Sequence, residues 1–369
     1  QSDRLVDVGD PAVISRVVHE PIGVCVLIAP WNYPLLLLAW KIAPALAAGN
    51  AVICKPSELT PLATLQLGPL FSDFPPGAVS ILAGAGEVGA ALVEDERIGG
   101  IAFTGSVPTG KKIGEICSQR VAHVNLELGG KDPFIVLPDI AEEIDIAARG
   151  GVWAAFLNAG QVCTSAERFY IHEKVYDEFV ANFIKHTEEL RLGDPMQAGI
   201  EIGPLASSVQ RQKVLDQVDK AVASGAEIVA GGGDSGQPHG HFIKPIVVTG
   251  APQDSALLNE ETFGPVAPIV RVSSLDEAIK QANSTVFGLG ANIYTRDLNS
   301  IVRCMREIKA GTVWFNDPLT DNDAGPFGGY KQSGFGRELG REGLEAFQET
   351  KHIHIETKIE AKEWWYPYN

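Results

Sequence analysis

The sequence predicts an α/β protein of two successive units, each built on a largely parallel sheet. From residue 21 onward, short apolar runs rich in β-branched residues end in Gly or Pro and alternate with longer helical patterns. The strand candidates are apolar on both faces, as is typical of parallel sheets that helices cover on both sides. Ligands of such sheets bind at the carboxyl ends of the strands, so the residues after each strand are the first candidates for function.

The first unit follows this alternation closely, and its elements can be assigned in order. Its strands are predicted at 23–30, 50–56, 78–84 and 99–105. Crossover helices are predicted between them at 35–49, 61–71 and 87–96.

The same alternation restarts after "ELGGKDPFIVLPD" (127–139), which indicates the second unit. The pair Gly129-Gly130 is a suitable hinge between the two. The polar, Gly-rich stretch 230–241 predicts a surface loop, and because its histidines lack Cys or acidic neighbours we predict no metal site. The elements predicted here are a helix at 139–157, a strand at 167–172, an amphipathic helix at 174–190 and further pieces up to 317.

Composition excludes several classes of function. A net charge of -16 makes nucleic acid and anionic membrane poor partners. The five cysteines are widely spaced and include no CxxC, so we expect neither a disulfide framework nor zinc but a reducing, cytoplasmic location. The longest apolar stretches are too short to span a bilayer and no secretory signal is visible. The chain opens without Met, and we expect that an N-terminal piece has been removed.

Two Gly-rich turns follow predicted strands. "GAGEVG" (84–89), which includes Gly86, fits the dinucleotide fingerprint GxGxxG, but it follows the third strand rather than the first, so a tight packing turn explains it equally well. "FTGSVPTG" (103–110) ends a strand and opens a helix, where Gly105, Ser106 and free backbone amides are suited to a phosphate.

"CKPSELTP" (54–61) places Lys55 and Glu58 immediately beyond a strand, where a bound ligand can reach them. Locally, the same residues also fit a helix start with Ser57 as its cap and an acid in the first turn. The two interpretations are compatible, since a helix start beside the crevice can hold ribose hydroxyls.

Three further residues are candidates for chemistry. Asn32 in "APWNYP" is bracketed by prolines after an apolar strand, which favours a preorganised amide donor. Glu127 lies among apolar residues, and a buried carboxylate is costly unless it is salt-bridged or catalytic. Cys163 in "NAGQVCTSAERFY" (158–170) is either a buried filler or a nucleophile.

The chain resembles the aldehyde dehydrogenase superfamily from residue 12 to about residue 355. Betaine-aldehyde and aminoaldehyde members look most similar, because of residues 29–58 and the ending "KEWWYPYN". The motifs that carry the resemblance are, in order, "PWNYP", "KPSE", "FTGS", "LELGGK", "GQVCTS", "EETFGPV" and "PFGGYKQSGFGRELG".

The resemblance implies three parts: a Rossmann-like parallel-sheet cofactor domain (21–128), an α/β catalytic domain (129–346), and a small β oligomerisation element made of 1–20 and 347–369. The family's N-terminal helical segment is not found in these residues, so we expect the N-terminal part of the cofactor domain to be missing. A homodimer or homotetramer is expected, with an interface that buries the apolar tail residues Trp364, Trp365 and Tyr366.

By the same resemblance, Cys163 is the nucleophile that adds to an aldehyde, forming a thiohemiacetal and then a thioester. A typical thiol, with a pKa of about 8.5, needs local help to ionise. Asn32 and the backbone N–H of Cys163 would stabilise the oxyanion. Glu127 would be the general base for hydrolysis, which implies a free acid product rather than acyl transfer to coenzyme A.

The expected cofactor is NAD. The resemblance assigns Lys55 and Glu58 to the adenosine ribose, and a carboxylate at Glu58 would repel the 2'-phosphate of NADP. Ser106 matches a pyrophosphate contact, and "GAGEVG" would lie near the adenine. The full set of expected cofactor residues is Lys55, Glu58, Ser106, Gly105, Trp31, Gly86, Glu261 and Phe263.

The expected partner is a small aldehyde. Aromatic residues of the implied tunnel and the acidic loop 316–323 favour a cationic substrate through cation–π and charge attraction. Glu338 in "GRELG" is expected to support structure rather than relay a proton. The tunnel residues are Tyr33, Trp40, Phe156, Trp314 and Phe327.

Three alternatives compete with this interpretation. A cysteine hydrolase would use Cys163 but would leave the cofactor motifs unexplained. A catalytically silent member would bind NAD without turnover. A related semialdehyde dehydrogenase would prefer NADP.

Overall fold

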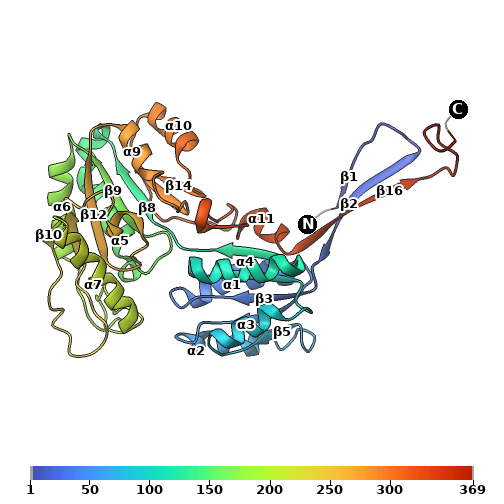
Figure 1. Ribbon diagram of the computed structural model, residues 1–369, viewed down its shortest axis with the longest axis horizontal. Helices are drawn as coiled ribbons and strands as arrows, with labels where there is room; N and C mark the ends of the chain where they lie inside the picture. Colours follow the sequence, from blue (N-terminus) through green and yellow to red (C-terminus); the bar gives the residue numbers. More distant parts are fainter. Residues whose placement is uncertain (1–2, 368–369) are drawn as a thin grey trace.

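The computed structural model describes residues 3–367, and this part of the chain forms three β-sheets. Two of them are covered by helices and lie side by side, while the third is a narrow ribbon that projects from the body (Figure 1). The predicted α/β fold of two units is therefore confirmed. Between residues 3 and 367, no helix is long and apolar enough to cross a bilayer.

The first unit is a six-stranded sheet in the order β15-β7-β6-β3-β4-β5. The chain begins at the central strand β3, fills one side with β4 and β5, and then crosses to β6 and β7. This change of direction opens a crevice at the carboxyl ends of β3 and β6. All pairings are parallel except that of β15 with β7. The strands are β3 (Val24–Ile28), β4 (Ala51–Lys55), β5 (Val79–Ile81), β6 (Gly100–Thr104), β7 (His123–Glu127) and β15 (Gly334–Phe335).

The helices of this unit differ from the prediction in one place. The pattern at 61–71 folds as the short helix α2 and a separate 3-10 turn at 68–71. The break coincides with Gly68-Pro69, where glycine is flexible and proline cannot donate to the preceding turn. The helices are α1 (Pro34–Ala47), α2 (Pro61–Leu65), α3 (Gly86–Glu94) and α4 (Val107–Arg120).

The second unit is a seven-stranded sheet in the order β10-β11-β12-β9-β8-β13-β14, parallel except for the edge pair β10 and β11. The predicted helix at 139–157 begins only at Ile144, because residues 138–143 form a 3-10 turn. The strands are β8 (Asp132–Val136), β9 (Ala166–His172), β10 (Glu227–Ala230), β11 (Ile246–Thr249), β12 (Val266–Val272), β13 (Gly290–Tyr294) and β14 (Thr312–Phe315); the helices are α5 (Ile144–Phe156), α6 (Tyr176–Glu188), α7 (Ser208–Ala223), α8 (Ala256–Asn259), α9 (Leu275–Ala282) and α10 (Leu298–Glu307).

Each face of this second sheet carries its own core. Aromatic rings stack on the face that α5 and α6 cover, where Phe134, Phe169 and Phe183 are fully buried. Smaller side chains such as Ile135 and Cys304 fill the face under α9 and α10. Strands buried on both faces hold the ends of their loops firmly, which suits them to position a site.

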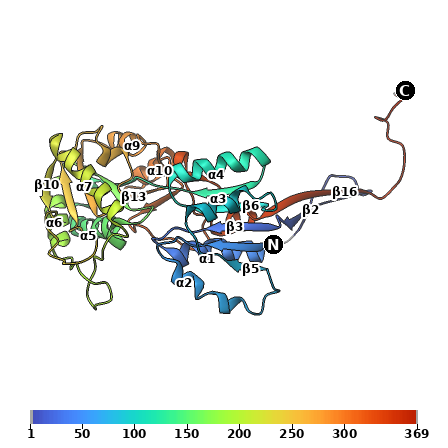
Figure 2. The same cartoon turned by 60° about the horizontal axis from the view of Figure 1, so that its bottom comes forward.

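The narrow third sheet consists of β1 (Arg4–Leu5), β2 (Val13–Pro21) and β16 (Gln348–Glu356). Strand β16 pairs antiparallel with β2 along the full length of both, and Figure 2 shows this ribbon extending away from the two larger sheets. The sequence assigned 1–20 and 347–369 to this part; residues 1–2 and 368–369 lie outside the described chain.

The boundary at residue 346 differs from the physical division. Residues of the segment 129–346 return to the first unit, where Gly334 pairs with Glu127 and helix α11 (Gly340–Glu345) packs near α1. The return requires glycine: a Cβ on Gly334 would lie 1.9 Å from the carbonyl oxygen of Leu126, and its φ is 127°. The edge of the first sheet is thus closed by the end of the predicted catalytic segment.

Candidate functional site

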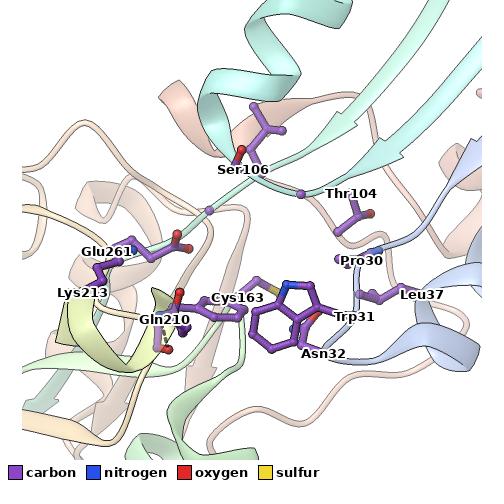
Figure 3. Close-up of a pocket in the computed structure, with 14 residues that line it drawn as sticks. Pro30, Trp31, Asn32, Leu37, Thr104, Ser106, Cys163, Gln210, Lys213 and Glu261 are labelled. Atoms are coloured by element: carbon purple, nitrogen blue, oxygen red, sulfur yellow. Dashed lines mark hydrogen bonds between the residues drawn. The ribbon is translucent and has the colours of Figure 1, made fainter. Parts of the chain in front are cut away.

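A cavity lies between the two large sheets, and its volume is about 680 Å³ when the space at its open mouth is included. Figure 3 shows Cys163 near its centre, with Trp31 and Asn32 on one side and Glu261 with Lys213 on the other. Its lining comes from both units: Pro30, Trp31, Asn32, Leu37, Thr104, Gly105, Ser106, Leu128, Gly129, Cys163, Gln210, Lys213, Glu261 and Phe263.

The turn before Cys163 has an unusual backbone. Asn158, Ala159 and Gly160 all have positive φ, at 52°, 56° and 72°, and such values are unfavourable for residues other than glycine. Gly160 is required, because a Cβ there would lie 2.3 Å from the carbonyl oxygen of Gly264. A close packing contact with the second sheet thus holds this strained turn and sets the position of Cys163.

Cys163 is only partly buried by its neighbours and faces the cavity. Burial raises the pKa of its thiol, and so do the carboxyl groups of Asp132, Glu127, Glu261 and Asp321. The causes found among residues 3–367 include no cation that lowers this pKa. The local help that thiol ionisation requires is thus not supplied by these side chains, and the ligand-free site favours the neutral thiol.

Asn32 lies just ahead of α1, in the turn that follows β3. Its Nδ2 donates to the carbonyl oxygen of Gln161 at 3.1 Å, and Asn158 Nδ2 donates to the carbonyl oxygen of Asn32 at 3.2 Å. These bonds tie the Asn32 turn to the turn before Cys163. Because an amide nitrogen carries two hydrogens, one remains to donate to a bound group.

Glu127 ends β7 and is buried, but it does not line the cavity of Cys163. Neither of its carboxyl oxygens has a hydrogen-bond partner among residues 3–367. Burial and the nearby Glu338 raise its pKa well above the usual range, against the opposing charges of Lys41 and Arg337. The carboxyl group lies next to Gly328, where a Cβ would lie 2.7 Å from its Oε1.

Lys41 is a functional candidate that the sequence interpretation missed. It is completely buried in α1, donates to Glu338 Oε1 at 2.5 Å and also donates to Thr104 Oγ1 at 2.5 Å. Glu338, whose charge acts on Glu127, is thus ion-paired with Lys41. A lone lysine in the apolar run "LLLLAWKIAPALA" was the available signal, since a buried charge requires a partner.

A second cavity of about 1530 Å³ adjoins the first at the carboxyl ends of β3, β4 and β6. Lys55 is buried, and its Nζ lies 3.8 Å from Glu58 Oε2 at the surface of this cavity. Gly86 lines it from the start of α3. The predicted cap Ser57 is not the first residue of a helix: its Oγ accepts from the N–H of Leu59, in a turn that precedes α2.

Ser106, Gly105 and Trp31 line both cavities and so mark their junction. Ser106 caps α4, because its Oγ accepts from the N–H of Thr109 at 3.4 Å. Ser106 and Thr109 line the larger cavity, so this helix start lies beside it, and the N-terminus of a helix is a suitable environment for an anion.

Glu261 and Phe263 close the other side of the junction. Glu261 Oε1 accepts from the N–H of Gly130 at 3.0 Å, and burial together with the charge of Glu167 raises the pKa of Glu261 to about 7. Phe263 has a φ of 56° and packs edge-on against Trp31 at 5.4 Å between ring centroids. Both residues line the same cavity as Cys163 and Asn32.

The lining also includes Gln210 and Lys213 of α7, which the sequence interpretation did not select. Gln210 Nε2 donates to the carbonyl oxygens of Thr262 and Phe263, at 3.0 and 2.8 Å. No motif marks these two residues, because they belong to an ordinary amphipathic helix that reaches the site only through tertiary packing.

The five predicted tunnel residues do not line either cavity. Tyr33 is near the nucleophile, since burial and Cys163 both raise its pKa, and Trp40 packs against Phe327 at 5.1 Å. Trp314 donates to the carbonyl oxygen of Thr320 and so anchors the acidic loop. Phe156 differs from the prediction: it is 2% exposed in the aromatic core under α5, because its side chain packs on Phe183.

The described residues contain no cluster that could hold a metal ion. Residues 2–353 match the sequence model of the Aldehyde dehydrogenase family. This chain belongs to the aldehyde dehydrogenase family. The predicted resemblance is thereby confirmed.

Individual relatives support the same assignment. The chain is 40% identical to betaine aldehyde dehydrogenase of Bacillus subtilis (strain 168), over 95% of this chain and 72% of the relative. It is 42% identical to retinaldehyde dehydrogenase 3 of Mus musculus, over 96% of this chain and 69% of the relative. The crystal structure of betaine aldehyde dehydrogenase from Staphylococcus aureus in complex with NAD+ superposes with a TM-score of 0.94 at 36% identity, covering 99% of this chain and 73% of that one.

Proposed function

We propose that this aldehyde dehydrogenase oxidises an aldehyde to the carboxylic acid at Cys163, with NAD as its cofactor. The observation that carries the proposal is the junction of two cavities: Cys163 and Asn32 line one, and Lys55 with Glu58 lines the other. Family membership supports the aldehyde chemistry, and the Staphylococcus aureus relative in complex with NAD+ supports the cofactor.

The larger cavity has the groups that NAD requires. Lys55 Nζ donates to the carbonyl oxygen of Pro56 at 3.2 Å and keeps donors for ribose oxygens. The half-exposed Glu58 carboxylate accepts from ribose hydroxyls and repels a 2'-phosphate, which favours NAD over NADP. Ser106 and the first turn of α4 suit the pyrophosphate. When bound, NAD supplies the hydride acceptor for the substrate carbon.

The first chemical step is addition of the Cys163 sulfur to the aldehyde carbon. The thiol proton passes to solvent water, a C–S bond forms, and the C=O π bond breaks, so that the carbonyl oxygen takes the electron pair as an oxyanion. The free hydrogen on Asn32 Nδ2 and the backbone N–H of Cys163 would donate to that oxygen. Loss of hydride from the same carbon leaves a thioester on Cys163.

Hydrolysis of the thioester requires a base, and Glu127 is our candidate. Neither of its oxygens has a hydrogen-bond partner among residues 3–367, and its raised pKa makes the ionised carboxylate a stronger base toward water than an ordinary glutamate. Because Glu127 does not line the cavity, its side chain must turn from Gly328 toward Cys163 for this step. Attack of water on the thioester carbon then breaks the C–S bond, releases the acid and restores the thiol.

The proposed substrate carries a positive charge near its aldehyde. Asp321 lies in the acidic loop 316–323 and is near enough to Cys163 to raise the pKa of its thiol, while burial raises the pKa of Asp321 itself to about 6. A cationic aldehyde would be attracted to this loop and to the aromatic ring of Tyr33, which lies near Cys163. The betaine aldehyde dehydrogenases among the relatives support this choice.

The test is NADH formation with betaine aldehyde, aminobutyraldehyde, succinic semialdehyde and a neutral aliphatic aldehyde, for the wild-type chain and for Cys163→Ala. We expect turnover that is highest with the cationic aldehydes, favours NAD over NADP, and disappears in the variant. A folded chain that binds NAD but oxidises none of the four would instead be a catalytically silent member, and a preference for succinic semialdehyde with NADP would replace the proposed substrate.

Assembly and location complete the proposal. We expect a homodimer or homotetramer, supported by the exposed apolar side chains Ile14, Ile355 and Trp364 on the ribbon and tail. Light scattering on the purified chain measures this directly. The domain roles predicted from the sequence and a cytoplasmic location are part of the same proposal.

A further inference from the structure

Glu167 is a buried carboxylate, 2% exposed, that the proposed chemistry does not use. It lies on β9, four residues beyond Cys163. Its Oε2 accepts from the N–H of Thr262 and its Oε1 from the N–H of Phe263, both at 2.7 Å. One side chain thus holds two consecutive backbone donors of the turn that carries Glu261 and Phe263.

Lys131 completes this arrangement from the opposite side. It is 1% exposed, and its Nζ donates to Glu167 Oε2 at 2.6 Å and to Thr262 Oγ1 at 2.9 Å. A buried carboxylate without its cation would be strongly destabilised, so the charge of Glu167 depends on Lys131. Lys131 and Glu167 thus form a buried ion pair, and both side chains also hydrogen-bond to the turn at 261–263.

These bonds connect three segments of the proposed site. Lys131 is four residues beyond Glu127, Glu167 is four residues beyond Cys163, and the turn at 261–263 contacts Trp31 through the ring of Phe263. The backbone N–H of Gly130 also donates to Glu261 Oε1, and a Cβ on Gly130 would lie 2.3 Å from the carbonyl oxygen of Cys163. Because of these bonds, a displacement of the Glu167 side chain would also displace the turn at 261–263.

The turn needs such support because of its backbone. Phe263 has a φ of 56°, a conformation that is unfavourable for a non-glycine residue unless its surroundings hold it. Gln210 secures the carbonyl oxygens of Thr262 and Phe263, and Glu167 secures their N–H groups. Both polar sides of the strained peptide units are thus fixed by side chains.

We propose that Glu167 is a positioning residue for the cofactor: its carboxylate, ion-paired with Lys131, fixes the turn at 261–263 and so places Glu261 and Phe263 against the nicotinamide end of NAD. This inference rests on the proposed function for its ligand. The placement of the turn itself does not, because it follows from hydrogen bonds within the chain. The two parts can therefore be tested separately.

The first measurement is amide hydrogen exchange at Thr262 and Phe263 in the ligand-free protein. Glu167→Gln has the same shape but offers one acceptor oxygen instead of two and loses the charge, so we expect exchange at both amides to accelerate at least about tenfold. Glu167→Asp keeps the charge with a shorter reach and should give a smaller effect. Glu201→Gln is the matched control, since Glu201 also accepts from a backbone N–H and pairs with Arg191, but on an exposed loop.

The second measurement is the Kd for NAD, followed by quenching of protein fluorescence, together with kcat and KM. We expect Glu167→Gln to raise the Kd and the KM for NAD about tenfold or more, with a smaller effect for Glu167→Asp and none for Glu201→Gln. A merely stabilising ion pair would lower the melting temperature and leave the Kd and the exchange at 262–263 unchanged. That result, in a folded Glu167→Gln protein, overturns the proposal.

Two further outcomes are decisive as well. If Glu167→Gln does not fold, Glu167→Asp and Thr262→Val, which removes only the Oγ1 that Lys131 contacts, replace it: accelerated exchange with weaker NAD binding supports the proposal, and wild-type values in both overturn it. If the wild-type chain does not bind NAD while exchange responds as expected, the proposed function fails and the role of Glu167 in holding the turn remains.

Discussion

At the scale of single residues, the chemistry of Cys163 depends on negative neighbours. Carboxyl groups surround it, and each ionised one raises the pKa of the thiol further. We predict that iodoacetamide alkylates Cys163 slowly at pH 7 and faster as the pH rises above 8.5. Asp132 is the largest of these charged contributions once it ionises, and its own pKa is about 8, so Asp132→Asn should lower the pKa of the thiol and accelerate alkylation above pH 8.

Cys163→Ala identifies the labelled residue in this experiment. The other cysteines, Cys25, Cys54, Cys117 and Cys304, are buried, so the variant should take up little reagent. An alkylation rate that is already maximal at pH 7 would show that the thiol ionises readily and would contradict the prediction.

Glu127 offers a second test at this scale. Glu127→Gln keeps the size of the side chain but cannot accept a proton from water, so hydrolysis of the thioester should slow by about 100-fold or more while its formation continues. Rapid mixing should then show a burst of NADH equal to the enzyme concentration, followed by a slow steady state. Loss of the burst itself would assign Glu127 to an earlier step.

At the scale of elements, the loop that follows β4 is expected to determine whether the protein prefers NAD or NADP. Glu58→Gln removes the carboxylate charge beside Lys55, so we predict that the ratio of kcat/KM for NADP to that for NAD rises at least about tenfold. Glu87→Gln is the control: this acid is in the first turn of α3, outside the lining of the cavity. An equal change in both variants would mean that overall charge, not the contact, controls the preference.

The elements also show how far sequence reasoning reaches. Four strands of the first sheet, β3, β4, β5 and β6, were predicted to within a few residues, because continuous apolar runs between Gly and Pro leave little choice. No bounds were predicted for β7 and β15 at its other edge. The helix predicted at 61–71 is interrupted at Gly68-Pro69. Ser57 does not cap a helix, because the choice between a cap and a turn depends on the backbone that follows it.

Sequence reasoning likewise selected some residues of the candidate site and missed others. Asn32 was selected from its local sequence and Cys163 by the family resemblance, and both line the cavity. Gln210 and Lys213 could not be found, since α7 reaches the cavity only by packing. Phe156 was selected by resemblance, yet its burial against Phe183 depends on how α5 lies over the second sheet.

At the scale of the whole molecule, buried acids couple stability to pH. Burial raises the pKa of Asp132 to about 8 and that of Glu261 to about 7, so the folded chain keeps protons that the unfolded chain releases near pH 4. The free energy of unfolding should therefore fall as the pH rises from about 5 to 8, by at most about 1.4 kcal/mol per pH unit for each such group.

Urea denaturation at pH 6 and pH 8 measures this slope. Asp132→Asn should reduce the difference between the two, because the amide does not titrate, whereas Asp95→Asn should leave it unchanged, since the pKa of the exposed Asp95 is lowered by Arg97 and it titrates well below this range. A free energy of unfolding that increases from pH 6 to 8 would contradict the assignment of these protons.

The ribbon has a consequence for biosynthesis. Strand β2 pairs along its whole length with β16, and the partners Val13 and Glu356 stand near opposite ends of the chain. Ribosomes add about 5–20 residues per second, so β2 waits roughly 15–70 s after its own synthesis before its partner exists. Throughout that interval its backbone donors and acceptors are available to other nascent chains, and this strand is where chaperone protection during translation is needed most.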